Sequence, residues 1–497
     1  MSLLGIDVGT TGCKAAAFSL DGRPIAQAYR EYPTLHPQDG WAELDSRRVV
    51  ALIKETIAEV AARTSRDPVT ALCASSMGEA MTPVSASGDI LGGCMLQTDV
   101  RGSDLLAECL AGLGQEAFFE INPNILGPNY TLPKLLWLKK HRPGLYAQAD
   151  RFLLWGDMVL AALGCEPLTS FSLANRTLLF DIRREDWSDA LLGRAGIDRR
   201  KLPRCVPSGT VSGTIADRAA DELGLPRGTV AVVGGHDQCC NSLGVGIDRP
   251  GMAVCGIGTV ECITPTYDHI PPAAAMLGCG LNVEHHVLPG LYVSFLYNQA
   301  GSLVRWFRDT FAAADRRLLA AGEDIYDVLA REMPPEPTRL LVLPYFEPTG
   351  SPRFMTDVAG AIVGLKTATT RGEILKAIME CVTFYFVESL DSLRRLKIDT
   401  SEFVATGGGA RSDAWLQIKA DVFGVPFVRP AFTECGVLGA AILAGAAIGR
   451  FATCAEGIAR FVRRDRVFEP DAGRHAIYAE RIAAYQRLYP ALKDLLG

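Results

Sequence analysis

The sequence opens with a short segment whose residue types could bind phosphate groups and a metal ion. The segment DVGTTGCK, residues 7–14, places a carboxylate, two glycines, two hydroxyls and a lysine after a buried apolar stretch. Glycines let backbone N–H groups approach phosphate oxygens, and the side chains of Thr10, Thr11 and Lys14 add donors and charge. The carboxylate of Asp7 can hold a hydrated Mg²⁺ against those phosphates. The segment lacks the spacing of a Walker A loop. The structural alternative to a phosphate site is an ordinary hairpin turn.

Two further glycine-rich turns lie in the second half of the sequence. GIGT, residues 256–259, repeats the small-residue turn after an apolar stretch and presents Thr259. GGGARSD, residues 407–413, stands between a predicted strand and a predicted helix, where Gly408 lets a ligand lie against the chain and Ser412 can cap the helix. The G-x-G-x-x-G spacing of a dinucleotide site is absent. Each turn alone could be structural. A nucleotide bound between the turn at 256–259 and the turn at 7–14 would explain why both are present.

The segment GGHDQ, residues 234–238, supplies a candidate catalytic base. Asp237 follows an apolar run that ends at two glycines, and it stands where a helix begins. A carboxylate in this place can accept the proton of a substrate hydroxyl. The structural alternative is a helix N-cap, and His236 is predicted to be structural. Phosphoryl transfer needs phosphate clamps, a metal and one placed base, and the sequence offers candidates for all three.

Composition and charge exclude several classes of protein. The chain has 497 residues, 48% hydrophobic and 21% charged, as in a globular protein of two or three domains. Its net charge of −6 provides no basic field for nucleic acid. The longest small-apolar run, residues 435–449, is shorter than the roughly 20 residues of a membrane span and predicts a closely packed helix. The N-terminus lacks a signal-peptide pattern and the fourteen cysteines are scattered, so we expect no membrane association, free thiols and a cytoplasmic location.

The hydrophobic pattern predicts an α/β protein with a repeated arrangement. Strand–turn–strand units begin near residues 3 and 252, about half the chain apart, which predicts duplicated domains at 1–246 and 247–497. One amphipathic helix is expected near the C-terminus, over residues 475–496. The other expected strands lie at 2–8, 14–19, 24–32, 71–77 and 229–237. Helices are expected over 46–64 and directly after Asp237. Residues 402–430 are expected to form a strand, a glycine turn, a helix and a second strand.

In their order and spacing, these motifs resemble the FGGY family of carbohydrate kinases over nearly the whole chain. DVGTTGCKAAAF and GTVECI resemble the two phosphate motifs of that family, and GGHDQ resembles the segment of its catalytic aspartate. NYTLPKLLWLKKH, residues 129–141, resembles its first signature and within the family is most similar to the xylulokinases. The resemblance implies a two-domain actin/Hsp70/sugar-kinase-like fold, duplicated and ribonuclease H-like, with ATP, Mg²⁺ and a sugar in a central cleft.

The resemblance also implies roles for individual residues. Asp237 would be the general base, Asp7 would organise Mg²⁺ through water, and Gln238 would contact the sugar. The residues implied to bind the nucleotide are Thr10, Thr11, Lys14, Thr259, Gly301, Arg305, Gly408 and Ser412.

The sugar side departs from the family's better-known patterns. SSMGEAM, residues 75–81, differs from the Q-M-H-G of xylulokinases and from the Arg-Glu pair of glycerol kinases. It leaves open whether Gly78 or Glu79 faces the sugar, and Asp99 and Gln238 are the other candidate contacts. Carboxylates accept hydrogen bonds from hydroxyls and repel acids. The predicted substrate is therefore a small neutral sugar or polyol, D-xylulose first, rather than a gluconate-like acid.

Two functions from other classes fit parts of the sequence. A catalytically silent sugar or nucleotide sensor on the same fold is disfavoured because Asp7, Lys14 and Asp237 are all present. An Hsp70-like ATPase acting on protein clients is disfavoured because no client-binding domain follows the second half. ATP turnover with and without sugars distinguishes the three functions. The oligomeric state, a homodimer included, stays open.

Overall fold

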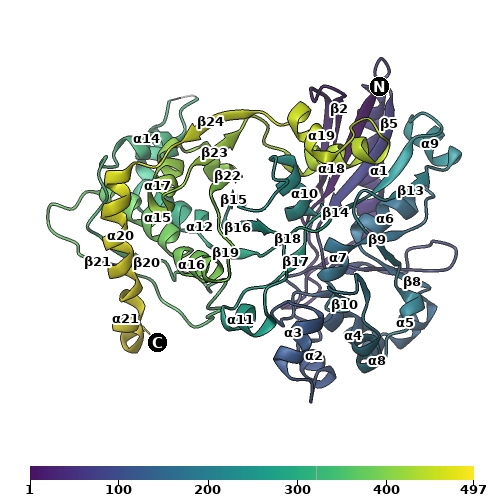
Figure 1. Cartoon of the computed structure of the whole chain (residues 1–497), viewed down its shortest axis with the longest axis horizontal. Coiled ribbons are helices and arrows are strands. Elements are labelled where there is room, and N and C mark those ends of the chain that lie inside the picture. Colours follow the sequence, from purple (N-terminus) through teal and green to yellow (C-terminus); the bar gives the residue numbers. More distant parts are fainter. Residues whose placement is uncertain (321, 497) are drawn as a thin grey trace.

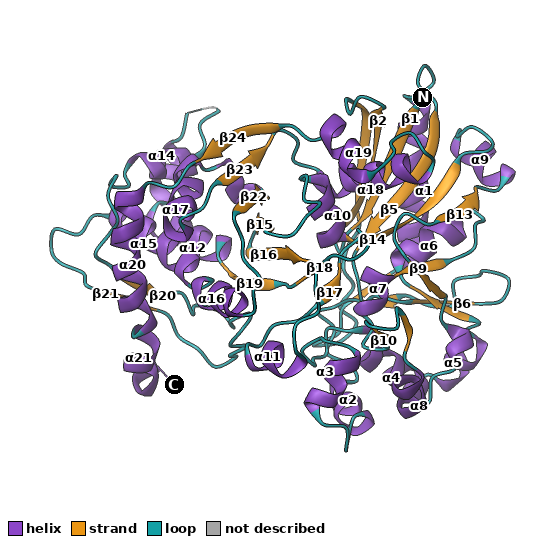
Figure 2. Cartoon of the chain, viewed as in Figure 1, coloured by secondary structure: helices purple, strands orange, loops and turns teal. Residues whose placement is uncertain are grey.

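The computed structural model describes residues 1–320 and 322–496 of the chain, which fold around two large β-sheets (Figures 1 and 2). The first sheet contains β1 (Ser2–Val8), β2 (Gly12–Ser19), β3 (Pro24–Glu31), β5 (Val69–Ser76), β13 (Val211–Thr214) and β14 (Val230–His236). Their order in the sheet is β13-β14-β5-β1-β2-β3. β14, β5 and β1 run parallel to one another, and the remaining neighbours pair antiparallel.

The second sheet repeats this arrangement. It contains β15 (Met252–Ile257), β16 (Val260–Tyr267), β17 (Glu284–His285), β18 (Tyr292–Val293), β19 (Leu296–Gln299), β22 (Glu402–Thr406), β23 (Phe427–Pro430) and β24 (Arg464–Phe468). The order β24-β23-β22-β15-β16-β19 matches β13-β14-β5-β1-β2-β3 strand by strand, with the same parallel and antiparallel pairs. The predicted duplicated α/β architecture is confirmed.

Helices and short strand pairs surround the two sheets. The helices before the second sheet are α1 (Ser46–Ala62), α2 (Ser103–Cys109), α3 (Gln115–Ile121), α4 (Thr131–His141), α5 (Pro143–Gln148), α6 (Trp155–Ala162), α7 (Phe171–Asn175), α8 (Asp189–Ala195), α9 (Asp217–Leu223) and α10 (Asp237–Gly244). The later helices are α11 (Ala273–Gly278), α12 (Gly301–Phe311), α13 (Ala313–Leu318), α14 (Ile325–Arg331), α15 (Arg371–Phe384), α16 (Val387–Arg395), α17 (Asp413–Phe423), α18 (Cys435–Ala447), α19 (Cys454–Phe461), α20 (Ala472–Gln486) and α21 (Leu488–Leu496). The 3₁₀ turns are η1 (Arg199–Lys201) and η2 (Gly408–Arg411). The short strand pairs are β4 (Glu43–Leu44) with β7 (Cys94–Met95), β6 (Thr82–Val84) with β8 (Arg151–Leu153), β9 (Leu168–Ser170) with β12 (Arg204–Val206), β10 (Phe180–Asp181) with β11 (Asp186–Trp187), and β20 (Leu341–Leu343) with β21 (Ala361–Val363).

The predicted small-residue helix, α18, packs closely against the first sheet although it comes late in the chain. Figure 1 shows α18 and α19, both yellow, beside the purple strand β2. A Cβ atom at Gly439 would lie 1.9 Å from the carbonyl oxygen of Cys240, and one at Gly244 would lie 1.8 Å from that of Cys435. Glycine at both positions therefore lets α10 and α18 cross with their backbones in contact. Across residues 1–320 and 322–496, no helix is long and apolar enough to span a membrane.

We predict that Gly439→Ala lowers the stability of the protein by about 1–3 kcal/mol, because the new methyl group must push α18 away from α10. Thermal unfolding monitored by circular dichroism measures the effect. Gly193→Ala in α8 is the matched control, since a Cβ there meets no atom within 4 Å. Equal unfolding midpoints for Gly439→Ala and wild type would contradict the close crossing.

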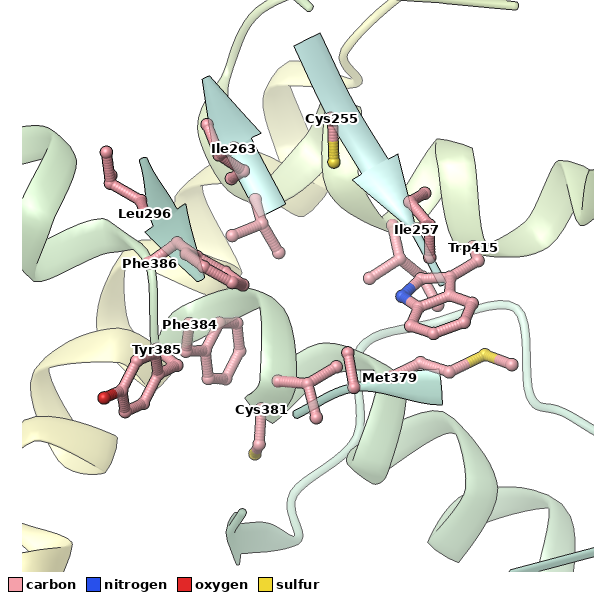
Figure 3. Close-up of a cluster of buried hydrophobic side chains, with 14 of the residues drawn as sticks. Cys255, Ile257, Ile263, Leu296, Met379, Cys381, Phe384, Tyr385, Phe386 and Trp415 are labelled. Atoms are coloured by element: carbon pink, nitrogen blue, oxygen red, sulfur yellow. The ribbon is translucent and has the colours of Figure 1, made fainter. Parts of the chain in front are cut away.

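The core of the second sheet encloses a buried ion pair directly behind the second predicted phosphate turn. Figure 3 shows Ile257 at the end of β15 beside Trp415 of α17. Nζ of Lys419 in α17 donates to Oε1 of Glu261 in β16 at 2.6 Å, and both side chains are 0% exposed. Glu261 is paired with Ile257 in the β15–β16 ladder. The ion pair therefore fixes α17 to the hairpin that carries residues 258–259.

The C-terminal segment differs from the single helix that its apolar spacing predicts. The structure has two helices there, α20 and α21, which meet at Arg487. Pro490 explains the break, because proline has no N–H for the residue four positions earlier and its ring crowds that carbonyl. The other predicted strands and helices are confirmed, with boundaries that differ by a few residues.

Candidate functional site

The parallel strands of the first sheet bring the candidate catalytic residues to one edge. Asp7 lies at the end of β1, Ser75 at the end of β5, and Asp237 directly after β14. Oγ of Ser75 donates to Oδ1 of Asp7 at 2.7 Å. Open α/β sheets bind ligands at the carboxyl ends of their parallel strands. Asp7 and Asp237, which are far apart in the sequence, therefore belong to one candidate site.

The surroundings of Asp237 suit a general base. Asp237 is the first residue of α10, whose N-cap is His236, so the predicted N-cap alternative is not what the structure shows. Its Oδ1 accepts from the backbone N–H of Gln238 at 2.6 Å, and its side chain is 32% exposed. Burial, followed by the negative charges of Asp7 and Glu79, raises the pKa of Asp237 to about 7. A carboxylate with a pKa near neutrality can both accept and release a substrate proton.

His236 lies between this carboxylate and the protein interior. Its Nε2 is 3.3 Å from Oδ1 of Asp237, and its ring packs against Phe295 at a centroid distance of 5.3 Å. Burial, helped by the positive charge of Arg176, lowers the pKa of His236 well below its usual value. The imidazole is therefore neutral at physiological pH and packs beside Asp237.

Strand β16 of the second sheet also lies near Asp237. Burial, followed by the charge of Asp237, raises the pKa of the Cys262 thiol to about 12, although a hydrogen bond with Thr264 opposes the shift. A Cβ atom at Gly235 would lie 2.4 Å from Cγ1 of Val287. Asp237 thus lies near Cys262 of β16, and the glycine two residues before it packs against the loop between β17 and β18.

The first predicted phosphate turn joins β1 to β2. Thr10 is half-buried and Thr11 is exposed, so both hydroxyls are accessible. The predicted phosphate ligand Lys14 instead forms an ion pair with Glu434, which is the N-cap residue of α18. The side chains of Lys14 and Glu434 keep 23% and 41% exposure. Lys14 can therefore exchange this carboxylate for a phosphate without unfolding its surroundings.

The second predicted phosphate turn joins β15 to β16 and carries the exposed Thr259. Nη2 of Arg305 donates to Oγ1 of Thr259 at 2.9 Å. The backbone N–H of Gly301 donates to the carbonyl of Gly258 at 3.2 Å, and a Cβ at Gly301 would lie 2.2 Å from that oxygen. Thr259, Gly301 and Arg305 are thus brought together as predicted for one nucleotide site.

The third glycine turn lies against the same strand end. Gly407 has a φ of 82°, and a Cβ there would lie 2.7 Å from the carbonyl oxygen of Ile257. Gly408 follows it on the exposed surface, at the start of η2. Oγ of Ser412 accepts from the backbone N–H of Trp415 at 3.3 Å, which confirms Ser412 as the N-cap of α17. β15 and β22 are parallel, so their turns share one edge of the second sheet.

The sugar side is built around Arg176, a residue for which the sequence provided no signal. Nε of Arg176 donates to Oε1 of Glu79 at 2.6 Å, and Nη1 donates to Oε1 of Glu284 at 2.5 Å. The side chains of Glu79 and Glu284 are 2% and 0% exposed. The guanidinium also lies over the rings of Tyr130 and Phe295, 4.8 and 5.6 Å from their centroids. The charge of Glu79 is therefore compensated by Arg176, whereas from the sequence we expected Glu79 to be a free carboxylate that repels acids.

Residues 78 and 79 have different parts in this arrangement. A Cβ atom at Gly78 would lie 3.0 Å from Cγ of Arg176 and 3.2 Å from Cδ2 of His236, so glycine leaves the space that Arg176 occupies. Glu79 adopts a φ of 61°, which is uncommon for a residue with a side chain. Its carbonyl accepts from Oγ1 of Thr131 at 2.6 Å. Backbone strain of this kind persists where neighbouring contacts fix it, often at functional sites.

Asp99 and Gln238 stand in different positions relative to this network. Asp99 is 0% exposed, and its carboxylate accepts from Nε of Arg101 at 2.9 Å and from the backbone N–H of Ala42 at 2.8 Å. The structure thus gives Asp99 structural partners and no direct contact with Asp237. Gln238 is half-buried beside Asp237. The role of both residues in binding sugar stays a prediction.

The donor set at the first sheet's edge fits a hydrated divalent cation. Within residues 1–320 and 322–496, no three His, Cys, Asp or Glu side chains converge as a complete metal cage. Burial raises the pKa of Asp7, and the charge of Asp7 contributes to the raised pKa of Asp237. The carboxylate of Asp7 beside the phosphate turn is a ligand of the kind that Mg²⁺ uses together with water and substrate phosphates.

Comparison with known proteins is consistent with this geometry. The models of the FGGY family of carbohydrate kinases match residues 2–244 for the N-terminal domain and 254–448 for the C-terminal domain. Xylulose kinase of Bacillus subtilis (strain 168) is 28% identical over 497 residues, 99% of this chain and 97% of that protein. Autoinducer-2 kinase of Escherichia coli (strain K12) is 30% identical over 521 residues, 100% of this chain and 94% of that protein. The crystal structure of xylulose kinase from Rhodospirillum rubrum is similar with a TM-score of 0.90 at 26% identity, covering 99% of both chains. The chain belongs to the FGGY family of carbohydrate kinases, which use ATP to phosphorylate sugars, and the predicted family, fold and enzyme class are confirmed.

Proposed function

We propose that this kinase transfers the γ-phosphoryl group of ATP to a hydroxyl of a small neutral sugar or polyol, with Asp237 as the general base. The observation that carries the proposal is the partly exposed carboxylate of Asp237, which directly follows β14 at the edge where β1 and β5 also end. Burial, which raises its pKa to about 7, suits it to act as a base. Asp237 would take the proton of the sugar hydroxyl as that oxygen attacks the phosphorus. Mg²⁺, held near Asp7 through water, would neutralise charge on the phosphates.

The two sets of turns would hold the nucleotide from opposite sides. Thr10, Thr11 and Lys14 would contact the phosphates from the first sheet. Gly301 and Arg305 contact the turn of Thr259 on the second sheet, and with Gly408 and Ser412 they would bind the nucleotide there. Closure of the two sheets around ATP and sugar would exclude water and limit wasteful hydrolysis.

D-xylulose is the first candidate substrate. The relatives named xylulose kinase are similar to this chain over nearly its whole length, and Glu79 with Gln238 offers polar groups for hydroxyls. A coupled ADP-release screen tests the choice over pentuloses, hexuloses, pentitols, erythritol, glycerol, autoinducer-2 and sugar acids. We expect the highest kcat/KM for a neutral compound. A marked preference for a sugar acid would refute the proposed substrate class.

The pKa of Asp237 predicts the pH dependence of the reaction. The base must be unprotonated to accept the hydroxyl proton, so kcat/KM for the sugar should fall as pH decreases through about 7. The limiting slope of log kcat/KM against pH should be one below that value. An initial-rate profile from pH 5.5 to 9 at saturating ATP measures it. A flat profile across this range would exclude Asp237 as the base.

The predicted domain boundary, partners, oligomeric state and location also belong to this proposal. A boundary between residues 246 and 247 separates the two sheets in sequence, although α18 and α19 cross back to the first sheet. The acidic net charge of −6 supports the absence of a nucleic-acid partner. A homodimer and a cytoplasmic location stay predictions. A catalytically silent sensor is not favoured, because relatives with the same fold are named kinases.

A further inference from the structure

A single buried cation joins two carboxylates from different halves of the chain at the sugar side of the site. Arg176 follows α7, Glu79 follows β5, and Glu284 begins β17 of the second sheet. The hydrogen bonds from Arg176 to Glu79 and Glu284 measure 2.6 and 2.5 Å. Nδ2 of Asn282 adds a bond of 2.7 Å to Oε1 of Glu284. The segment is held against the loop that follows α3 by a further bond from the N–H of Val283 to the carbonyl of Pro123 at 2.9 Å.

This network lies next to the reacting carboxylate. The space above Gly78 is bounded by Arg176 on one side and by His236 on the other, at 3.0 and 3.2 Å from an ideal Cβ. His236 in turn is 3.3 Å from Asp237. A sugar that presents a hydroxyl to Asp237 must therefore place its neighbouring groups near the network. Arg176 is itself only 11% exposed, so its charge is weakly screened by water.

The charges of the network do not favour an anionic ligand. The single positive charge of Arg176 faces two carboxylates, so the ionised network carries one negative charge in excess. Within residues 1–320 and 322–496, Oε2 of Glu284 is buried and has no hydrogen-bond partner. Its charge is weakly screened there and would repel the carboxylate of a sugar acid bound beside the network.

We propose that Glu284, as the second carboxylate against the single cation of Arg176, makes this kinase select neutral sugars over sugar acids. The inference rests on the proposed function for the place of the sugar, but it concerns a residue from the second half of the chain. It also replaces the simpler expectation that Glu79 and Asp99 repel acids as free carboxylates.

The test is Glu284→Gln, which keeps the shape of the side chain and an oxygen that can accept from Arg176. We measure kcat/KM for D-gluconate and for the best neutral sugar, and the equilibrium binding of D-gluconate and D-xylulose by calorimetry. The gluconate-to-neutral ratio should rise at least about tenfold, because the network then loses its excess negative charge. Glu79→Gln should shift the ratio in the same direction. Glu284→Gln combined with Arg176→Gln should return it toward wild type.

Controls separate a charge effect from damage to the fold. Glu402→Gln removes a carboxylate that pairs with Arg464 away from the site, and it should leave the ratio unchanged. The KM for ATP and the thermal unfolding midpoint should stay near wild type in Glu284→Gln. If Glu284→Gln keeps the wild-type ratio within twofold, the inference is wrong, whatever Glu79→Gln does. Wild-type protein without any sugar turnover would instead refute the proposed function, and the binding ratio would still test Glu284.

Discussion

Replacing Asp237 by asparagine should lower kcat by about 10²–10⁴, the usual contribution of a positioned base, while the KM for ATP changes little. Asparagine keeps the size of the side chain and its place at the start of α10. It cannot accept the hydroxyl proton. Initial rates with the best sugar from the screen, at saturating ATP, give both constants.

The same substitution should stabilise the folded protein at high pH. Burial raises the pKa of Asp237 to about 7 in the folded chain, so the folded state binds the proton more tightly than the unfolded state does. The free energy of unfolding therefore decreases as pH rises from about 4 through 7. Asp237→Asn removes this loss, and its unfolding midpoint should exceed that of wild type at pH 8 but not at pH 4. Near wild-type turnover in a variant with this stability profile would show that Asp237 is not the base.

Replacing Lys419 by methionine should destabilise the protein by about 3–5 kcal/mol, because it leaves the carboxylate of Glu261 buried without its partner. Both side chains are fully buried in wild type, and Lys419 also donates to Oγ1 of Thr383 at 3.3 Å. Urea unfolding followed by tryptophan fluorescence measures the loss.

Two further variants make this prediction specific. Glu261→Gln combined with Lys419→Met removes both charges and should recover much of the lost stability. Arg227→Met breaks an exposed ion pair with Asp221, whose side chains are 62% and 58% exposed, and should cost less than about 1 kcal/mol. If Lys419→Met behaves like Arg227→Met, the buried pair does not stabilise the second sheet.

The features that the sequence predicted are those that depend on local pattern. Apolar runs ending at Asp7, Gly234 and Ile257 identified the strands, and the glycines after them identified the turns. Asp237 was predicted because one carboxylate follows one strand, and the structure places it at the start of α10. Such signals need only the residues within a few positions of one another.

The features that the sequence did not predict depend on contacts between distant segments. Arg176 is 97 positions from Glu79 and 108 from Glu284, and no spacing rule connects them. Only the pairing of β14 with β5, and the return of β17 toward α7, brings these side chains together. Lys14 was predicted near phosphates, but its ion pair with Glu434 depends on α18 crossing back to the first sheet. The glycine at position 78 was the one local hint, because it leaves room for a side chain from elsewhere.

The most direct test of the account is the stoichiometry of the reaction, followed by ³¹P NMR in a mixture of enzyme, Mg²⁺, ATP and the best neutral sugar. We predict one phosphosugar formed for each ADP, no appreciable inorganic phosphate, and no ADP release when the sugar is omitted. ADP and inorganic phosphate released at one rate with or without sugar would indicate an ATPase. Sugar binding without any ADP or phosphosugar would indicate a silent sensor, and either result would contradict a sugar kinase with Asp237 as its base.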